Sequence, residues 1–181
     1  MSGLRHEPNP FWRFSLRAYR LPGVEDALLR LQDEAGTDTN ILLWCCWLAS
    51  LGRSLDTRTL RRARAATARW QSEVIVALRL ARRSLKRAPQ GLPEGWAADL
   101  RRRIGAVELD MEYAEQRALF ALTQTLVPPA RASAPRDAAR ASIARYLDLL
   151  GAVATPASTR RVDTIICACL AREPDRSAPP M

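Results

Sequence analysis

Apolar residues recur three and four positions apart along most of the chain, the spacing that gathers side chains on one face of a helix. Turn and capping residues divide this pattern into seven predicted helices: Gly36 ends the second, Asp38 caps the third and Asp56 caps the fourth. The pattern therefore predicts an all-α chain. Its helices are expected over residues 10–19, 22–35, 39–51, 57–88, 94–126, 136–150 and 159–171.

The third predicted helix is apolar on almost every side, because every residue from Ile41 to Leu48 is apolar. A helix of this kind is buried on most of its surface, so we expect it at the centre of a multi-helix bundle. Asn40, Trp44 and Trp47 follow one another at helical spacing and share one face.

The fourth and fifth predicted helices are long and amphipathic, and a short connector, Pro89–Pro93, separates them. We expect them to pack as a long antiparallel helical hairpin. Glu108, Glu112 and Glu115 share one face of the fifth helix, either solvated or paired with arginines of the neighbouring helix. The inward stripe expected on the fourth helix is Leu60, Ala63, Trp70, Val74, Ala77, Ala81 and Leu85. The inward stripe expected on the fifth helix is Trp96, Leu100, Ile104, Val107, Met111, Ala114, Ala118 and Leu122.

Composition also favours helices. Ala and Leu number 30 and 25, against 13 for Val and Ile together. Ala and Leu favour helix whereas β-branched residues favour strands, which argues against an all-β fold and against a parallel α/β sheet.

Prolines and polar stretches suggest how the chain is divided. We expect a helical core domain over residues 10–127, and we expect the core to fold when the chain is truncated after Val127. The other predicted parts are a disordered N-terminus over 1–9, a Pro-rich linker over 128–135, a two-helix C-terminal extension over 136–172 and a disordered tail over 173–181.

The net charge of +9 arises from 28 Lys and Arg against 19 Asp and Glu. The whole excess lies between Arg53 and Arg87, where eleven basic residues accompany two acidic ones. These arginines form either a solvated helix face or an anion-binding face for acidic protein, nucleic acid or anionic lipid. Trp70 is expected on the apolar side of the helix, so no aromatic residue is interleaved on the arginine face and a nucleic acid would be held by its phosphates. The candidate anion-binding face comprises Arg58, Arg61, Arg62, Arg69, Arg79, Arg83 and Arg87.

Carboxylates and amides are concentrated immediately before the apolar third helix, from Gln32 to Asn40. Helix capping and local structure explain these residues well. The alternative is the polar wall of a small-ligand pocket beside two indoles. The candidate pocket comprises Asp33, Asp38, Asn40, Trp44 and Trp47.

Few residues suit catalysis or metal binding. The single histidine, His6, precedes the first predicted helix, which excludes a Ser-His-Asp triad from the helical body. Neither Cys45-Cys46 nor Cys167-x-Cys169 has a C-x-x-C zinc or redox spacing. We expect no catalytic residue, metal or cofactor. With no export signal and no run long enough to span a bilayer, we expect a cytoplasmic protein with reduced thiols.

Short motifs follow one another at specific spacing in the first half: Phe11-Trp12-x-Phe14-x-Leu16-x-x-Tyr19, Pro22-Gly23-Val24, Leu31-Gln32-Asp33 and Asp38-x-Asn40-x-Leu42-Leu43-Trp44-Cys45-x-Trp47. They resemble a proteobacterial family of uncharacterised conserved proteins, an unknown-function domain, over about residues 10–126. The resemblance implies a compact helical domain of a bacterial, cytosolic protein and carries no known activity.

Three functions are compatible with these observations. The first is a non-enzymatic helical interaction protein whose arginine-rich face docks an acidic partner, which the lack of a catalytic constellation favours. The second is binding of RNA or DNA through the phosphate backbone by the same face. The third is an enzyme or ligand carrier with a pocket near Asp33, Asp38 and Asn40.

Overall fold

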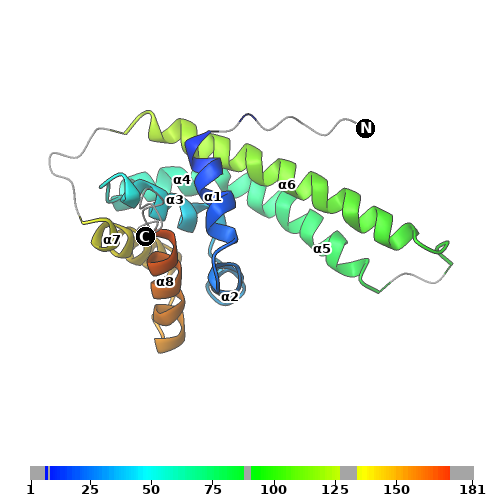
Figure 1. The fold of residues 1–181 in the computed structure, drawn as a ribbon. Coiled ribbons are helices and arrows are strands. Elements are labelled where there is room, and N and C mark those ends of the chain that lie inside the picture. The colour runs from blue at the N-terminus through cyan, green and yellow to red at the C-terminus, as the bar shows by residue number, and fades with distance from the viewer. Residues whose placement is uncertain (1–6, 8, 88–90, 127–133, 172–181) are drawn as a thin grey trace, which may run out of the picture. The chain divides into compact units, whose positions relative to one another are not determined.

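A computed structural model describes residue 7 and residues 9–87, 91–126 and 134–171. These residues form helices and no strand, which confirms the predicted all-α fold class. The predicted disordered ends and Pro-rich linker fall almost entirely outside the described residues. The elements are α1 (Pro10–Tyr19), α2 (Val24–Ala35), α3 (Thr39–Ser50), α4 (Thr57–Arg69), the π-helix η1 (Trp70–Ile75), α5 (Val76–Ser84), α6 (Trp96–Thr123), α7 (Pro135–Leu150) and α8 (Pro156–Cys169) (Figure 1).

Capping residues define several of the helix ends. Gly36 ends α2 in the left-handed conformation, with φ of 62°, and its N–H donates to the Gln32 carbonyl. Asp38 begins α3, because its Oδ1 accepts the backbone N–H groups of Asn40 at 2.8 Å and Ile41 at 3.4 Å. α8 starts earlier than predicted, at Pro156, because Thr155 forms a capping box with Ser158.

The helix predicted over residues 57–88 is interrupted by the π-helix η1. A π turn holds more residues than an α turn, so the helix that follows is rotated relative to the one before. Ile75, at the end of η1, and Arg79, in α5, are the buried positions here. The predicted inward stripe is therefore wrong at Trp70, Ala77 and Ala81, which are exposed. The stripe predicted on the fifth helix is likewise wrong at Trp96 and Val107, which are 58% and 45% exposed.

The described helices belong to two compact units. The first unit lies within Met1–Ser15 and Arg58–Val127, and the second within Leu16–Thr57 and Pro128–Met181. In the first unit α5 packs on α6, and η1 contacts both. Figure 1 shows α5 and α6 side by side. Trp12 packs edge-on against Tyr113, with ring centroids 5.2 Å apart.

The second unit is built around α3, of which every residue except Ser50 is buried. It packs on α2, α7 and α8, as the apolar character of α3 requires. Two hydrogen bonds join α7 to segments far away in sequence. The Asp38 N–H donates to the Tyr146 hydroxyl, and the Leu55 N–H donates to Ser142 Oγ, both over 2.9 Å.

These units differ from the predicted domain order, which set α7 and α8 apart as an extension of a core over residues 10–127. In the structure α7 and α8 share a compact unit with α2 and α3. The physical reason is that α3 is apolar all round and needs helices on several sides. A chain truncated after Val127 would lack two of them.

Candidate anion-binding site

Two arginines of α5 meet two glutamates of α6. Arg79 Nε and Nη2 donate to Glu108 Oε1 and Glu112 Oε1, each over 3.1 Å. Arg82 donates twice to Glu108, from Nε to Oε2 over 2.6 Å and from Nη2 to Oε1 over 3.3 Å. The Arg79 and Glu108 side chains are only 10% and 8% exposed. Pairing of the α6 glutamates with arginines of the neighbouring helix is thus confirmed for Glu108 and Glu112.

Opposing effects act on the ionisation of this network. Burial disfavours the charged form of Glu108, but hydrogen bonds and charges from Arg82 and Arg79 outweigh it and lower the pKa of Glu108 below its ordinary value of 4.5. The hydrogen bond to Glu108 raises the pKa of Arg82. Glu108 and Arg82 are therefore both charged at neutral pH and hold α5 on α6.

Basic side chains from both helices surround an open depression beside this network. The depression has a volume of about 350 Å³ and is lined by Arg82, Ala98, Arg101 and Arg102. Gly105 of α6 lies against the stem of Arg82, since a Cβ at this position would be in ordinary van der Waals contact with Arg82 Cδ, at 3.5 Å.

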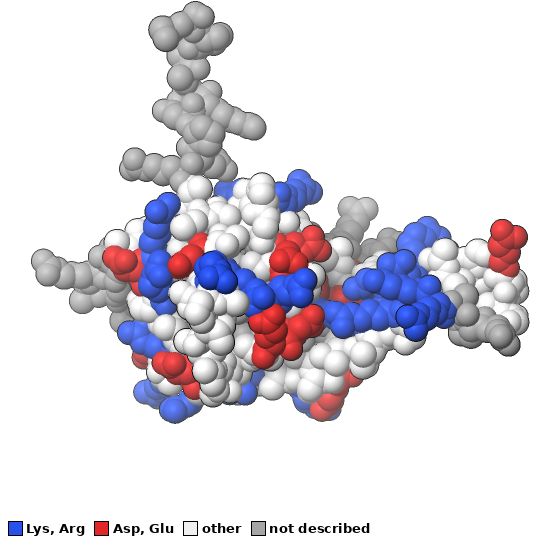
Figure 2. Space-filling model, turned by 90° about the horizontal axis from the view of Figure 1, so that it is seen from below, with Lys and Arg blue, Asp and Glu red and all other residues white. Residues whose placement is uncertain are grey.

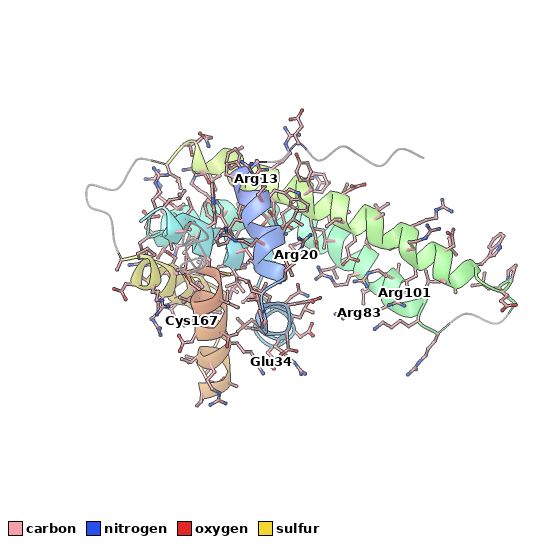
Figure 3. The ribbon with its side chains drawn as sticks, in the orientation of Figure 1. Arg13, Arg20, Glu34, Arg83, Arg101 and Cys167 are labelled. Atoms are coloured by element: carbon pink, nitrogen blue, oxygen red, sulfur yellow. The ribbon has the colours of Figure 1, made fainter. Side chains whose placement is uncertain are left out.

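Further cations extend the rim of the depression. Lys86 follows the end of α5 at Ser84 and is exposed, as are Arg83, Arg101 and Arg102. Figure 3 shows Arg83 of α5 and Arg101 of α6 on the same side of the helix pair. Figure 2 shows a continuous patch of Lys and Arg side chains over this pair. We call Arg82, Arg83, Lys86, Arg101 and Arg102 the basic cluster.

The arginines of the predicted anion-binding face have different environments. Arg79 is buried and lies in the ion-pair network, because the π-helix η1 rotates α5 relative to α4. Arg69 is exposed and pairs with Glu73 over 3.1 Å, and Arg62 donates to Thr125 over 3.2 Å. The remaining members, Arg58, Arg61, Arg83 and Arg87, are exposed.

The anion-binding face predicted from the sequence contains only arginines between Arg58 and Arg87, so it lacks Arg101 and Arg102, which line the depression from α6. The sequence contains a signal for them, because a helix that packs on α5 brings its own arginines close to those of α5. Finding them required the register between α5 and α6, which depends on the π-helix.

The five residues of the candidate pocket all lie in the second unit, but they do not share one surface. Asp33 is exposed on α2, whereas Asp38 is the buried cap of α3. Asn40, Trp44 and Trp47 are 2%, 0% and 7% exposed. Capping and core packing account for four of the five positions.

Replacement of Asp38 by Ala should destabilise the protein by about 1–2 kcal/mol, because the N–H groups at the start of α3 lose their acceptor. Asp38→Asn keeps an oxygen for this bond and should cost less. Asp33→Ala, at an exposed position, should change the free energy of unfolding by under about 0.5 kcal/mol. Urea denaturation measures all three, and equal effects of Asp38→Ala and Asp33→Ala would refute the capping role.

The cysteines of the second unit are free thiols. Cys46 and Cys169, on α3 and α8, share a hydrogen bond, which lowers the pKa of Cys169 and raises that of Cys46. Burial raises the pKa of Cys45. The Cys46–Cys169 contact could not be predicted from the sequence, because it joins two helices that lie far apart along the chain.

Within the part of the chain that is described, no group of three or more His, Cys, Asp or Glu is arranged to hold a metal ion. In that same part, none of the helices combines the length and apolar character needed to cross a bilayer.

Comparison with known families gives one match. Residues 10–119 match the model of a family described as "Protein of unknown function (DUF2390)". No curated protein and no solved structure matches the chain. The matched region includes α1 to α5 and most of α6, and it agrees with the resemblance inferred over about residues 10–126. Because the match covers more than half of the chain, this protein belongs to the DUF2390 family of proteins of unknown function.

Proposed function

We propose that this protein is a non-enzymatic interaction protein that binds an acidic segment of a partner protein on the basic cluster. The observation that carries the proposal is the open depression on the helix pair, which three arginines line from two helices. Guanidinium groups bind carboxylates through paired, charge-assisted hydrogen bonds, and several of them converge on this depression.

Ion pairs hold one side chain of the site in place. Arg82 lines the depression and donates a hydrogen bond to Glu108. Arg79 donates to both Glu108 and Glu112. Side chains that are already ordered lose little conformational entropy when a ligand binds. The ion-pair network thus supports recognition as well as the packing of α5 on α6.

A second candidate is binding of RNA or DNA through the phosphate backbone. It is favoured by Arg58 and Arg61, two further exposed arginines, which lie on α4 in the same unit. A phosphate-binding track of this kind would show steep weakening with salt and little dependence on base sequence.

The cell compartment is part of the proposal. Free thiols at Cys45, Cys46, Cys167 and Cys169 suit a reducing environment. We therefore place the protein in the bacterial cytoplasm.

The test is a binding titration with a fluorescent glutamate-rich peptide and with single-stranded RNA, at low and physiological ionic strength. Arg83→Glu with Arg101→Glu should weaken peptide binding by about tenfold or more, equivalent to about 1.4 kcal/mol. The matched control is Arg20→Glu with Arg160→Glu, two exposed arginines of the second unit. Each pair lowers the net charge by the same four units, so net charge alone cannot distinguish them.

Peptide binding that survives in the control and is lost in the Arg83 and Arg101 variant supports the proposal. Equal loss in both variants would mean that net charge, not the basic cluster, attracts the peptide. Tighter binding of RNA than of peptide at physiological salt would favour the second candidate.

A further inference from the structure

The helix pair of α5 and α6 has a second flank, opposite the basic cluster, that is apolar. Arg79 and Arg82 meet Glu108 and Glu112 on one side of the contact between the helices. Helical spacing places another set of residues on the other side of that contact. We call this set the apolar flank: Leu78, Ala81 and Leu85 from α5 and its C-cap, and Leu100, Ile104 and Val107 from α6.

None of the six residues of the apolar flank is buried in the chain. Val107 is 45% exposed, and Trp96, at the start of α6, is 58% exposed on the same side. A continuous apolar strip that remains accessible on a helix pair indicates an interaction surface.

We propose that a second copy of this chain covers the apolar flank, so that α5 and α6 of two molecules form an antiparallel four-helix arrangement. In such a dimer, a two-fold axis passes between the two copies of α6, at the level of residues 106 and 107. The apolar flank of each molecule then packs on that of the other. The two basic clusters stay on the outer sides, where they do not oppose each other.

Charges at the edge of the flank are self-complementary about this axis. Arg103 and Asp110 lie on one edge of α6, at equal distances on either side of the axis. Antiparallel pairing therefore places Arg103 of each molecule beside the oppositely charged residue 110 of the other. The same axis brings exposed Trp96 opposite exposed Arg117, a favourable cation–π pairing. A partner with an unrelated sequence has no reason to match both pairs.

The size of the flank sets the expected affinity. The axis maps the stretch of α6 from Trp96 to Arg117 onto itself, and this stretch is about 32 Å long from the helical rise, while the helix pair is about 20 Å wide from the helix diameter. Two such strips remove on the order of 1,000 Å² of surface from water, at the low end of specific interfaces. We therefore expect a reversible dimer with a dissociation constant in the micromolar range.

Sedimentation equilibrium over a range of concentrations tests the dimer directly. The native chain should pass from monomer to dimer, and Val107→Glu should weaken association by about a hundredfold or more. Leu109→Glu is the matched control, since Leu109 is 43% exposed on the same helix but faces away from the apolar flank. It should dimerise like the native chain. A native chain that stays monomeric, or equal effects of the two substitutions, overturns the proposal.

A cross-linking experiment covers the case in which Val107→Glu impairs folding. With exposed Cys167 replaced by Ser, Val107→Cys should form a disulfide-linked dimer under mild oxidation, because the axis passes next to residue 107. Leu109→Cys should not. Cross-linking of both, or of neither, contradicts the proposed axis.

Dimerisation and binding of the acidic peptide should respond differently to salt concentration. Dimerisation through the apolar flank should persist or strengthen at high salt, because screening reduces repulsion between two molecules of charge +9. Binding of the acidic peptide should weaken under the same conditions. Each proposal can therefore fail without the other.

Discussion

A chain truncated after Val127 should fail to form a cooperatively folded protein. The truncation removes α7 and α8, which pack on α3 and α2 in the second unit. It would expose part of a helix that is buried at every position except Ser50. The Asp38 and Leu55 N–H groups would also lose their acceptors on Tyr146 and Ser142.

An ordinary domain is stable by only about 5–15 kcal/mol. The loss of two packed helices and of two buried hydrogen-bond acceptors should therefore remove most of the stability of the second unit. We expect the truncated protein to be insoluble or to resemble a molten globule, with helical circular dichroism but no sharp thermal transition. The control is removal of only the residues after Ala171, which leaves α7 and α8 in place and should preserve the transition. Cooperative unfolding of the chain ending at Val127 would show that α3 does not depend on α7 and α8.

Replacement of Glu108 by Gln should destabilise the protein by about 3 kcal/mol, the lower end of the range for breaking a buried ion pair. The substitution preserves size but removes the charge that Arg79 and Arg82 share. Arg79 is then left largely buried, with its Nη2 still 3.1 Å from the Glu112 carboxylate. Glu73→Gln is the matched control, because Glu73 pairs with Arg69 at the surface, where ion pairs contribute little.

The difference between native protein and the Glu108→Gln variant should depend on pH. Because the pKa of Glu108 is lower in the folded protein than its ordinary value, its charge stabilises the fold above about pH 4.5. This contribution is lost as the pH falls through the folded pKa. Urea unfolding at neutral and at acid pH should therefore show a large difference that shrinks on acidification. A difference below about 1 kcal/mol at neutral pH would show that the network is not stabilising.

Features that depend on single residues and their neighbours could be predicted from the sequence. The Gly36 and Asp38 caps and the burial of α3 follow from local chemistry, and the structure has all of them. Pairing with arginines of the neighbouring helix was one of the two alternatives for Glu108, and the structure has it.

Features that depend on register or on distant packing could not be predicted. A π-helix has no distinctive composition, so η1 was missed, and with it the burial of Arg79. Arg101 was overlooked for the same reason, since its place beside Arg82 depends on how α5 and α6 align. Whether α7 packs on the core could not be decided from the sequence, because the composition of the Pro-rich linker does not indicate where the next helix docks.

The central claim is that the basic cluster binds an acidic partner protein. Affinity capture from a lysate of the source organism, with and without nuclease, tests it most directly. The immobilised proteins are the native chain, the variant with Arg83→Glu and Arg101→Glu, and the charge-matched variant with Arg20→Glu and Arg160→Glu. We predict a protein that the native chain and the charge-matched variant retain after nuclease treatment, and that the Arg83 and Arg101 variant does not. Equal retention by all three, or loss of the protein with nuclease, would contradict the claim.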